Sequence, residues 1–304
     1  MYYIVFGLLY LLSLLPYWVL YGIADLLAFL LFAVFRYRRR IVYENIRNSF
    51  PEMNEKQVNK LCHAFYRNFM ANWFETIKLI SISPERLMQR VSGNFEIFQH
   101  PFEQGRKICL VQGHIFNWEM LGLAFSLKSP SPSIFVYMPL SNKNMDRFFQ
   151  RLRSRFGAHL MAATSFNKEI ISWRRKQYAI GLLADQSPGN PYDAHWLQFL
   201  GQPTAFVTGP ERNTIAFDQV PFFVNISRSR LGRYHFHFES LFPDGDVPRE
   251  KGAITQAFAE KLELNVRQHP ELYLWSHRRW KHQWSPAYNG LWVDKLHELP
   301  VEKK

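Results

Sequence analysis

The stretch that decides the fold is KICLVQGHIFNWEMLGLAFSL, residues 107–127. Its opening run, KICLVQG, is almost wholly apolar and ends in a glycine, which indicates a buried strand. The following NWEMLGLAFSL has the length and apolar content of a helix. A strand that leads directly into a helix is the building unit of a parallel α/β sheet, so this stretch predicts that architecture.

The same alternation continues along the chain. Further strands are predicted at residues 133–140, 159–163, 178–186, 220–229 and 233–242, and further helices at residues 144–157, 167–176, 209–217 and 254–269. We therefore expect an α/β fold with a mixed, largely parallel sheet flanked by helices, which spans residues 95–284.

Residues 1–35 contain one charged side chain, Asp25, and are otherwise strongly apolar. About 20 such residues can span a bilayer as a helix, and no basic segment of the kind that opens a signal peptide precedes them. Pro16 divides the run, which favours either one kinked span or two short helices that dip into one leaflet. A buried hairpin is the alternative, but the scattered Tyr and Trp side chains suit a membrane interface better.

The flank of this predicted anchor is RYRRR, residues 36–40. By the positive-inside rule it lies on the cytoplasmic side, and the rest of the chain follows it. Residues 36–94 are predicted to form a helical, membrane-proximal segment, because apolar residues recur at helical spacing from Val58 to Ile77. The pattern does not place residues 285–304, a tail of aromatic and polar residues.

Composition narrows the choice of partners. The formal net charge of +12 predicts attraction to nucleic acid, a phospholipid surface, a phosphorylated substrate or an acidic protein. Two cysteines, Cys62 and Cys109, cannot make a disulfide framework, which favours a reducing compartment. The sequence lacks a P-loop and a dinucleotide glycine pattern, so no cofactor is expected. His235 and His237 share one face of a predicted strand without a clear third ligand, so no metal is expected.

A histidine and a glutamate, His114 and Glu119, stand at the junction of the first strand and helix. With 11 His and 25 acidic residues in 304, about one such pair arises by chance, and His297 with Glu302 is a second. Context favours the first pair, because ligands gather at the carboxyl ends of strands in α/β sheets. At this place His114 can face a substrate hydroxyl, and Glu119 can fold back onto its other ring nitrogen, fix the tautomer and stabilise the imidazolium. The free amides of the helix's first turn would favour developing negative charge.

Two further polar clusters follow apolar runs. DQSPG, residues 185–189, ends one predicted strand, and LYLW, residues 272–275, runs into SHRRWKHQW. The second cluster has arginines for phosphate and tryptophans for stacking, as nucleic-acid patches do. The core-like LYLW and the preceding anchor argue against nucleic acid as a partner. Three polar clusters at predicted strand ends are a stronger signal of a site than any one alone.

Five segments then occur in a familiar order: RRRIVYENIRNSFPE (38–52), HIFNWE (114–119), DQSPG (185–189), WLQFLGQPTAFVTGP (196–210) and YLWSHRRWK (273–281). Together they resemble the bacterial lipid A late acyltransferases, of the lauroyl and myristoyl type, in the lysophospholipid acyltransferase superfamily. The resemblance covers residues 1 to about 284. It implies an inner-membrane enzyme whose α/β domain faces the cytoplasm. The implied reaction moves a fatty acyl chain from acyl carrier protein, or from CoA, to a hydroxyl of a lipid A precursor. Membrane phospholipid is the other expected partner.

The resemblance also implies roles for individual residues. His114 is the general base and Glu119 its partner, and a catalytic arginine is expected in RLRSRFG, with Arg155 the first choice and Arg153 the second. The remaining residues are assigned to substrate binding or to shaping the site: Asn117, Asp185, Gln186, Arg278, Arg279 and Lys281. The last three are expected either to meet glucosamine phosphates or to hold the fold.

Other functions remain open at this point. The acceptor could be another lipid, such as a lysophospholipid or an amino-acid lipid. The chain could instead be a membrane-anchored protein that binds polyanions without catalysis, although nothing in that function requires His114 and Glu119. A hydrolase using the same pair would release free fatty acid without an acceptor.

Overall fold

The central sheet has seven strands in the order β1-β9-β8-β2-β5-β3-β4. The computed structural model describes residues 2–300. All strand pairings in this sheet are parallel except the one between β8 and β9. The strands are β1 (Val91–Gly93), β2 (Lys107–Gln112), β3 (Ser133–Tyr137), β4 (His159–Ala162), β5 (Ala179–Leu183), β8 (Gln219–Arg230) and β9 (Arg233–Ser240). The predicted α/β fold with a mixed, largely parallel sheet is confirmed.

Strand β2 lies in the middle of this sheet and is covered on both faces. Ile108 and Leu110 point to one face, Cys109 and Val111 to the other, and all four are buried. A parallel strand between two layers of helices has no polar face, which is why KICLVQG is a continuous apolar run. The helices of this α/β part are α6 (Gln99–Glu103), α7 (Trp118–Lys128), α8 (Lys143–Arg153), α9 (Phe166–Glu169), α10 (Gly209–Ala216) and α11 (Ala253–Gln268).

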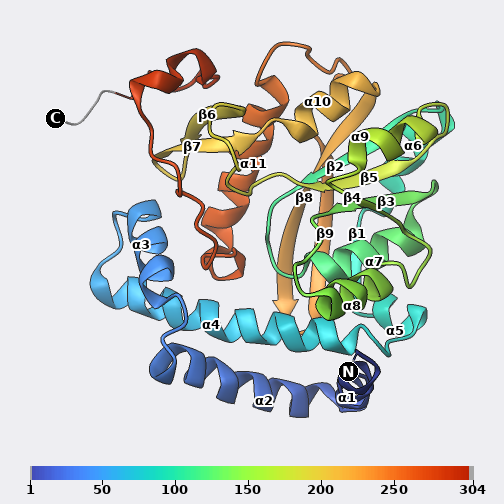
Figure 1. The fold of residues 1–304 in the computed structure, drawn as a ribbon, viewed down its shortest axis with the longest axis vertical. Coiled ribbons are helices and arrows are strands. Elements are labelled where there is room, and N and C mark those ends of the chain that lie inside the picture. Colours follow the sequence, from blue (N-terminus) through green and yellow to red (C-terminus); the bar gives the residue numbers. More distant parts are fainter. Residues whose placement is uncertain (1, 301–304) are drawn as a thin grey trace.

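The apolar N-terminus forms two helices, with Pro16 between them. They are α1 (Tyr2–Leu14) and α2 (Tyr17–Phe29), and a π-helical turn, Leu30–Val34, extends α2. The extended helix is long and apolar enough to cross a membrane by length and composition, and 22% of it is buried. It runs alongside α4 (Glu55–Lys78), and α1 contacts the same helix (Figure 1). The two remaining helices of this part are α3 (Arg39–Ser49) and α5 (Pro84–Met88).

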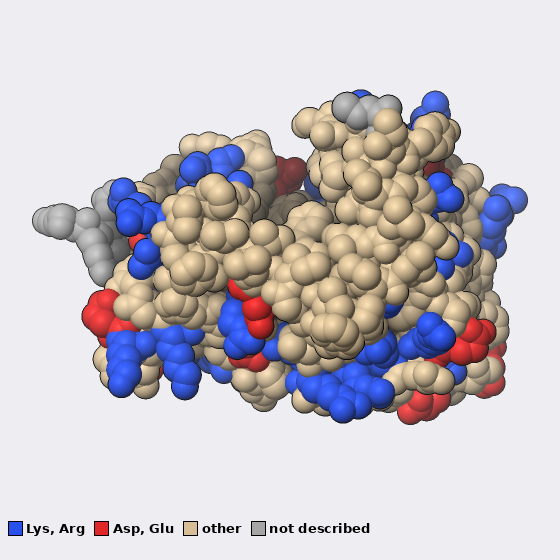
Figure 2. All heavy atoms as spheres, turned by 90° about the horizontal axis from the view of Figure 1, so that it is seen from below, with Lys and Arg blue, Asp and Glu red and all other residues tan. Residues whose placement is uncertain are grey.

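The face formed by the N-terminal helices is almost free of charge. Seen from below, a broad uncharged surface has lysines and arginines gathered along its margin (Figure 2). Several large apolar side chains of these helices are exposed, among them Ile4, Leu8, Leu11, Trp18, Leu26 and Phe29. An apolar surface of this kind with a cationic border is typical of a protein that contacts a membrane.

Two elements differ from the sequence-based expectation. Residues 167–176 do not form one helix, because α9 ends at Glu169 and a 3-10 helix, Ile170–Trp173, follows it. LYLW is not a strand: a short 3-10 helix, Pro270–Leu272, precedes an extended segment that makes a single bridge between Ile115 and Tyr273. That bridge nevertheless places the segment beside the loop that follows β2.

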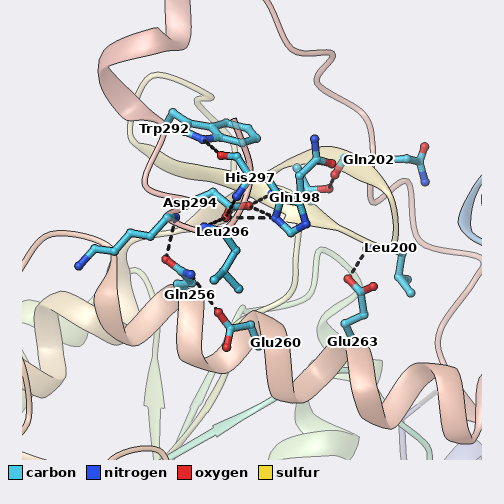
Figure 3. Close-up of polar contacts among 12 residues, drawn as sticks. Gln198, Leu200, Gln202, Gln256, Glu260, Glu263, Trp292, Asp294, Leu296 and His297 are labelled. Carbon is cyan, nitrogen blue, oxygen red and sulfur yellow. Dashed lines mark hydrogen bonds and ion pairs between the residues drawn. The ribbon is translucent and has the colours of Figure 1, made fainter. Parts of the chain in front are cut away.

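A two-stranded hairpin and the C-terminal tail lie outside the main sheet. The hairpin joins β6 (Ala194–Phe199) to β7 (Gln202–Val207), a segment to which the sequence pattern assigned no structure. The tail contains a 3-10 helix, Pro286–Leu291, and Trp292 bridges to Trp196 of β6. Asp294 then accepts the backbone N–H of Gln198 at 2.8 Å, so the tail is fixed against both the hairpin and α11 (Figure 3).

Candidate active site

His114 and Asp185 meet at the carboxyl ends of two neighbouring strands. β2 and β5 are paired in parallel, so the residues that follow each strand lie side by side. His114 Nδ1 is 2.6 Å from Asp185 Oδ1, and the backbone N–H of His114 donates to Asp185 Oδ2 at 3.0 Å. Both side chains are buried. Two of the predicted polar clusters therefore form one contact, although 71 residues separate them.

The contacts of the His114 imidazole define its tautomer. An ionised carboxylate only accepts hydrogen bonds, so the proton of the neutral ring is on Nδ1 and Nε2 has the free lone pair. The side-chain amide nitrogen of Gln186 lies 3.2 Å from Nε2 and donates to it. Nε2 is therefore the ring nitrogen that can accept a proton, as a general base requires, and the Gln186 amide occupies it in this structure.

Asp185 is ionised although it is buried. Burial by itself raises the pKa of this carboxyl, but His114, through its charge when protonated and through its hydrogen bonds, and the nearby Arg279 lower the pKa to about 2. Burial and then the Asp185 charge hold the pKa of Tyr273 well above its ordinary value. The Asp185 carboxylate is thus close to a cation, Arg279, and to a neutral phenol, Tyr273.

Glu119 was expected to contact the His114 ring, but it does not. Its carboxylate is bound by Arg153, whose Nε donates to Oε2 at 2.9 Å, and by the indole N–H of Trp118 at 3.1 Å. The guanidinium binds this carboxylate with two of its nitrogens, which strengthens the pair. The expected contact is wrong because a cation from α8 occupies the carboxylate and Asp185 already occupies Nδ1.

The two candidate arginines of RLRSRFG lie in different places. Arg153, the second choice, is in the cavity wall with Glu119. Arg155, the first choice, donates from its guanidinium to the carbonyls of Leu79 and Ile82, just beyond the end of α4. Burial lowers the pKa of Arg155 from its ordinary range, and its contacts are those of a residue that fixes a helix end.

Asn117 was expected to bind substrate, but it is fully buried and both ends of its amide are occupied. Its Oδ1 accepts the N–H of Met120 at 3.0 Å and so caps α7, while Nδ2 donates to Glu75 at 3.1 Å. It holds the loop that joins His114 to α7.

The basic C-terminal motif is divided between surface and interior. Arg278 and Lys281 are exposed, whereas Arg279 is 2% exposed and donates to the carbonyl of Ala205 at 2.7 Å. His277 accepts the N–H of Ser187 at 3.1 Å, and burial lowers its pKa to about 4, so this ring is neutral near pH 7. Of the two roles considered for Arg279, these contacts favour holding the fold.

A cavity of about 730 Å³ opens beside His114. Its polar lining includes His114, Glu119, Arg153 and Gln186, and the rest is mainly apolar. The apolar walls come from α4, α7, α8 and the strand ends, for example Phe69, Trp73, Leu123, Phe135, Met145 and Phe149. A mainly apolar cavity with a few polar groups beside His114 fits a ligand with a hydrocarbon chain and a reactive polar end.

The comparison with known families decides the identity. The model of the bacterial lipid A biosynthesis acyltransferase family matches residues 1–282. The chain belongs to this family. It is also 27% identical over 283 residues to a lipid A biosynthesis lauroyltransferase of Escherichia coli strain K12, covering 90% of this chain and 89% of that protein.

Membership in the lipid A acyltransferase family gives the geometry its chemical context. This chain is an acyltransferase that acts on a lipid A-type acceptor. The family match ends at residue 282, so the aromatic tail that covers the β6–β7 hairpin lies beyond it. The resemblance seen in the five sequence segments is thereby confirmed.

Two residues near the site escaped sequence reasoning. Glu75 lies in a helix and belongs to none of the motifs singled out from the sequence, whereas Tyr273 lies within LYLW and YLWSHRRWK but was given no role there. A glutamate on the apolar face of a predicted helix is the one signal that could have drawn attention to Glu75. Tyr273 had no such signal, because a tyrosine in LYLW is compatible with ordinary core packing.

Proposed function

We propose that this acyltransferase moves a fatty acyl group from a thioester donor to a hydroxyl of a lipid A precursor, with His114 as general base. The observation that carries the proposal is the His114–Asp185 pair at the wall of an apolar cavity. Acyl carrier protein and acyl-CoA are both anionic donors, and the net charge of +12 suits either. Binding of the acyl chain in the cavity would leave its thioester near His114.

In the proposed reaction, Nε2 of His114 accepts the proton of the acceptor hydroxyl as its oxygen attacks the thioester carbonyl carbon. The carbonyl π bond opens to give a tetrahedral intermediate with negative charge on the former carbonyl oxygen. When the carbonyl re-forms, the C–S bond breaks and the thiolate takes the proton from Nε2. Asp185 stabilises the imidazolium that exists between these two proton transfers. No cofactor enters this sequence.

The other polar groups have supporting roles in this proposal. Arg153 is kept at the cavity wall by Glu119, and among the described residues its Nη1 has no hydrogen-bond partner. We assign it to the developing negative charge of the intermediate or to an acceptor phosphate. The positive end of α7 begins beside His114 and favours the same charge.

The direct test is the His114→Ala variant of the full chain. It should lose on the order of 10² to 10⁴ in acyl-transfer rate, because the base is removed while the cavity remains. Transfer is measured by mass spectrometry of the acceptor, with acyl carrier protein and CoA thioesters supplied separately. His237→Ala, which changes an exposed histidine on β9, is the matched control and should be fully active.

Near-normal transfer by folded His114→Ala protein would refute the assignment of the base. The same assay separates the alternatives. Free fatty acid released without acceptor would indicate a hydrolase, and acylation of a lysophospholipid in preference to a lipid A precursor would indicate another acceptor. Binding of the donors with no transfer by the unaltered chain would indicate a binding protein.

A further inference from the structure

A second buried carboxylate, Glu75, lies outside the proposed catalytic pair. It is 1% exposed and accepts four hydrogen bonds. Oε1 accepts from the Tyr21 hydroxyl at 3.0 Å and from the Gly232 N–H at 2.9 Å. Oε2 accepts from Asn117 Nδ2 at 3.1 Å and from the Tyr234 hydroxyl at 2.7 Å. No lysine or arginine forms an ion pair with Glu75 within residues 2–300, so these four donors stabilise the carboxylate.

The four donors come from three separate parts of the molecule. Tyr21 belongs to α2, the helix whose other side exposes Trp18, Leu26 and Phe29. Gly232 and Tyr234 belong to the turn and the last strand of the β8–β9 hairpin. Asn117 belongs to the loop that carries His114. Glu75 is thus the meeting point of the apolar N-terminal helices, the sheet and the proposed active site.

Glu75 also determines how the Asn117 amide is turned. Its carboxylate can only accept, so it requires the nitrogen of that amide on its side. The amide oxygen is then directed to the N–H of Met120 and caps α7. Asn117 lies three residues after His114, and the loop between them is held at its other edge by Phe116 N–H and His114 C=O, which bond to Leu272 and Leu274.

We propose that Glu75 is a positioning residue. It couples the position of helix α2 against the domain to the orientation of the loop that carries His114. This proposal rests on the proposed function, because it assumes that His114 is the base. Glu75 itself does not line the cavity, so its effect on the reaction is indirect. When α2 is displaced from α4, Tyr21 leaves Glu75 and the loop loses one of its fixed supports.

The isosteric change Glu75→Gln tests the coupling sharply. Each carboxylate oxygen faces one group that can only donate: the Gly232 N–H at Oε1 and Asn117 Nδ2 at Oε2. The new amide NH₂ must therefore face a donor in either orientation. It is accommodated at Oε2 only when the Asn117 amide turns, and the cap on Met120 is then lost. We expect kcat to fall about 10- to 100-fold, with the donor KM changed less than about twofold.

The double variant Glu75→Gln, Asn117→Asp separates positioning from general damage. An aspartate at position 117 accepts from the new amide with one oxygen and from the Met120 N–H with the other. It should recover most of the kcat that Glu75→Gln loses. Tyr21→Phe removes only the bond from α2 and should lower kcat by about two- to fivefold with the protein still folded.

The matched control is Asp25→Asn. Asp25 on α2 binds Arg67 on α4 at 2.9 Å, so it joins the same two helices, but this pair is exposed and does not reach Asn117. Its kcat should equal that of the unaltered chain. Full kcat in folded Glu75→Gln protein, or a double variant no better than the single one, would overturn the proposal. An active His114→Ala protein would instead refute the proposed function, so the two failures are distinguishable.

Discussion

Asp185 keeps its charge in the interior because several partners act on one carboxylate. Its Oδ1 is close to the His114 ring and its Oδ2 accepts the backbone N–H of the same residue. The backbone N–H of His114 can only donate, which matters for the proposed role of His114 as a base. It fixes which oxygen of the side chain faces which group, and so it leaves Oδ1 alone to define the imidazole tautomer.

Replacement of Asp185 by asparagine is therefore expected to be much more harmful than its small change in size suggests. The amide oxygen would be taken by the His114 N–H, and the NH₂ group would face Nδ1. The ring would then carry its proton on Nε2, where the base is needed. We predict a loss in kcat on the order of 10³- to 10⁴-fold. Single-turnover acyl transfer measures it, and ¹⁵N shifts of the histidine ring report the tautomer.

A variant with normal kcat, or with Nδ1 still protonated, would contradict this prediction. The matched control is Asp218→Asn, because Asp218 is an exposed acidic residue that forms only a long contact, 3.7 Å, with Arg106.

The pKa of Asp185 also makes the stability of the fold depend on pH. Since folding lowers it to about 2, the stabilisation is complete above the unfolded value near 4 and is lost as the pH falls toward 2.

At the scale of elements, α7 and α8 are joined by the Glu119–Arg153 ion pair at the cavity wall. Arg153 lies 34 residues beyond Glu119, and the pair is partly buried. Removing one member of such a pair leaves the other charge without a partner in a poorly solvated place. The stability losses of the two single variants should therefore not add up in the double variant.

We predict that Glu119→Gln and Arg153→Met each lower the free energy of unfolding by about 2 to 4 kcal/mol, and that the double variant loses less than their sum. Thermal or denaturant melting measures the cycle. Arg40 and Glu44 form an exposed pair on α3, and the same cycle there should give about 0.5 kcal/mol or less. Additive losses at Glu119 and Arg153 would show that the contact has little energetic weight.

The helices and strands differ in how well they could be predicted from the sequence. β2, α7 and β5 were predicted from apolar runs, because burial on both faces leaves a strong pattern. The β6–β7 hairpin was not assigned: its turn residues, Leu200 and Gly201, both have positive φ, and a leucine gives no sign of this. His114 and Asp185 could be found at strand ends, but the partner of His114 could not. The spacing in the sequence favoured Glu119 as the partner of His114, and only the fold shows that Glu119 binds Arg153 instead.

At the scale of the whole molecule, α1 and α2 supply an exposed apolar face. Near its beginning, α1 is held by α8, where Arg147 donates to the Tyr3 hydroxyl at 3.1 Å and lies over the Tyr2 ring. Both α1 and α2 also contact α4, so each helix packs against the rest of the chain and does not extend away from it. This arrangement favours the second sequence-based option, two short helices that dip into one leaflet.

We predict that an epitope tag at the N-terminus lies on the same side of the membrane as the α/β domain. On intact spheroplasts the tag should be undetected, and it should appear once the membrane is permeabilised. The same tag at the C-terminus is the control and should behave alike. An N-terminal tag accessible from the periplasm while the C-terminal tag is hidden would indicate a full span. Release of the protein by high salt alone would indicate an electrostatic attachment.

The distance along the chain between His114 and Asp185 has an evolutionary consequence. Adjacent strands carry the two residues, yet β3, α8 and β4 are inserted between them in sequence. This inserted segment supplies much of the cavity wall, including Phe135, Met138, Met145 and Phe149. Substitutions there can reshape the space available to an acyl chain while β2 and β5 keep the histidine and the aspartate in register. If His114 and Asp185 act as proposed, the fold lets substrate preference diverge among descendants without renewed selection on this pair.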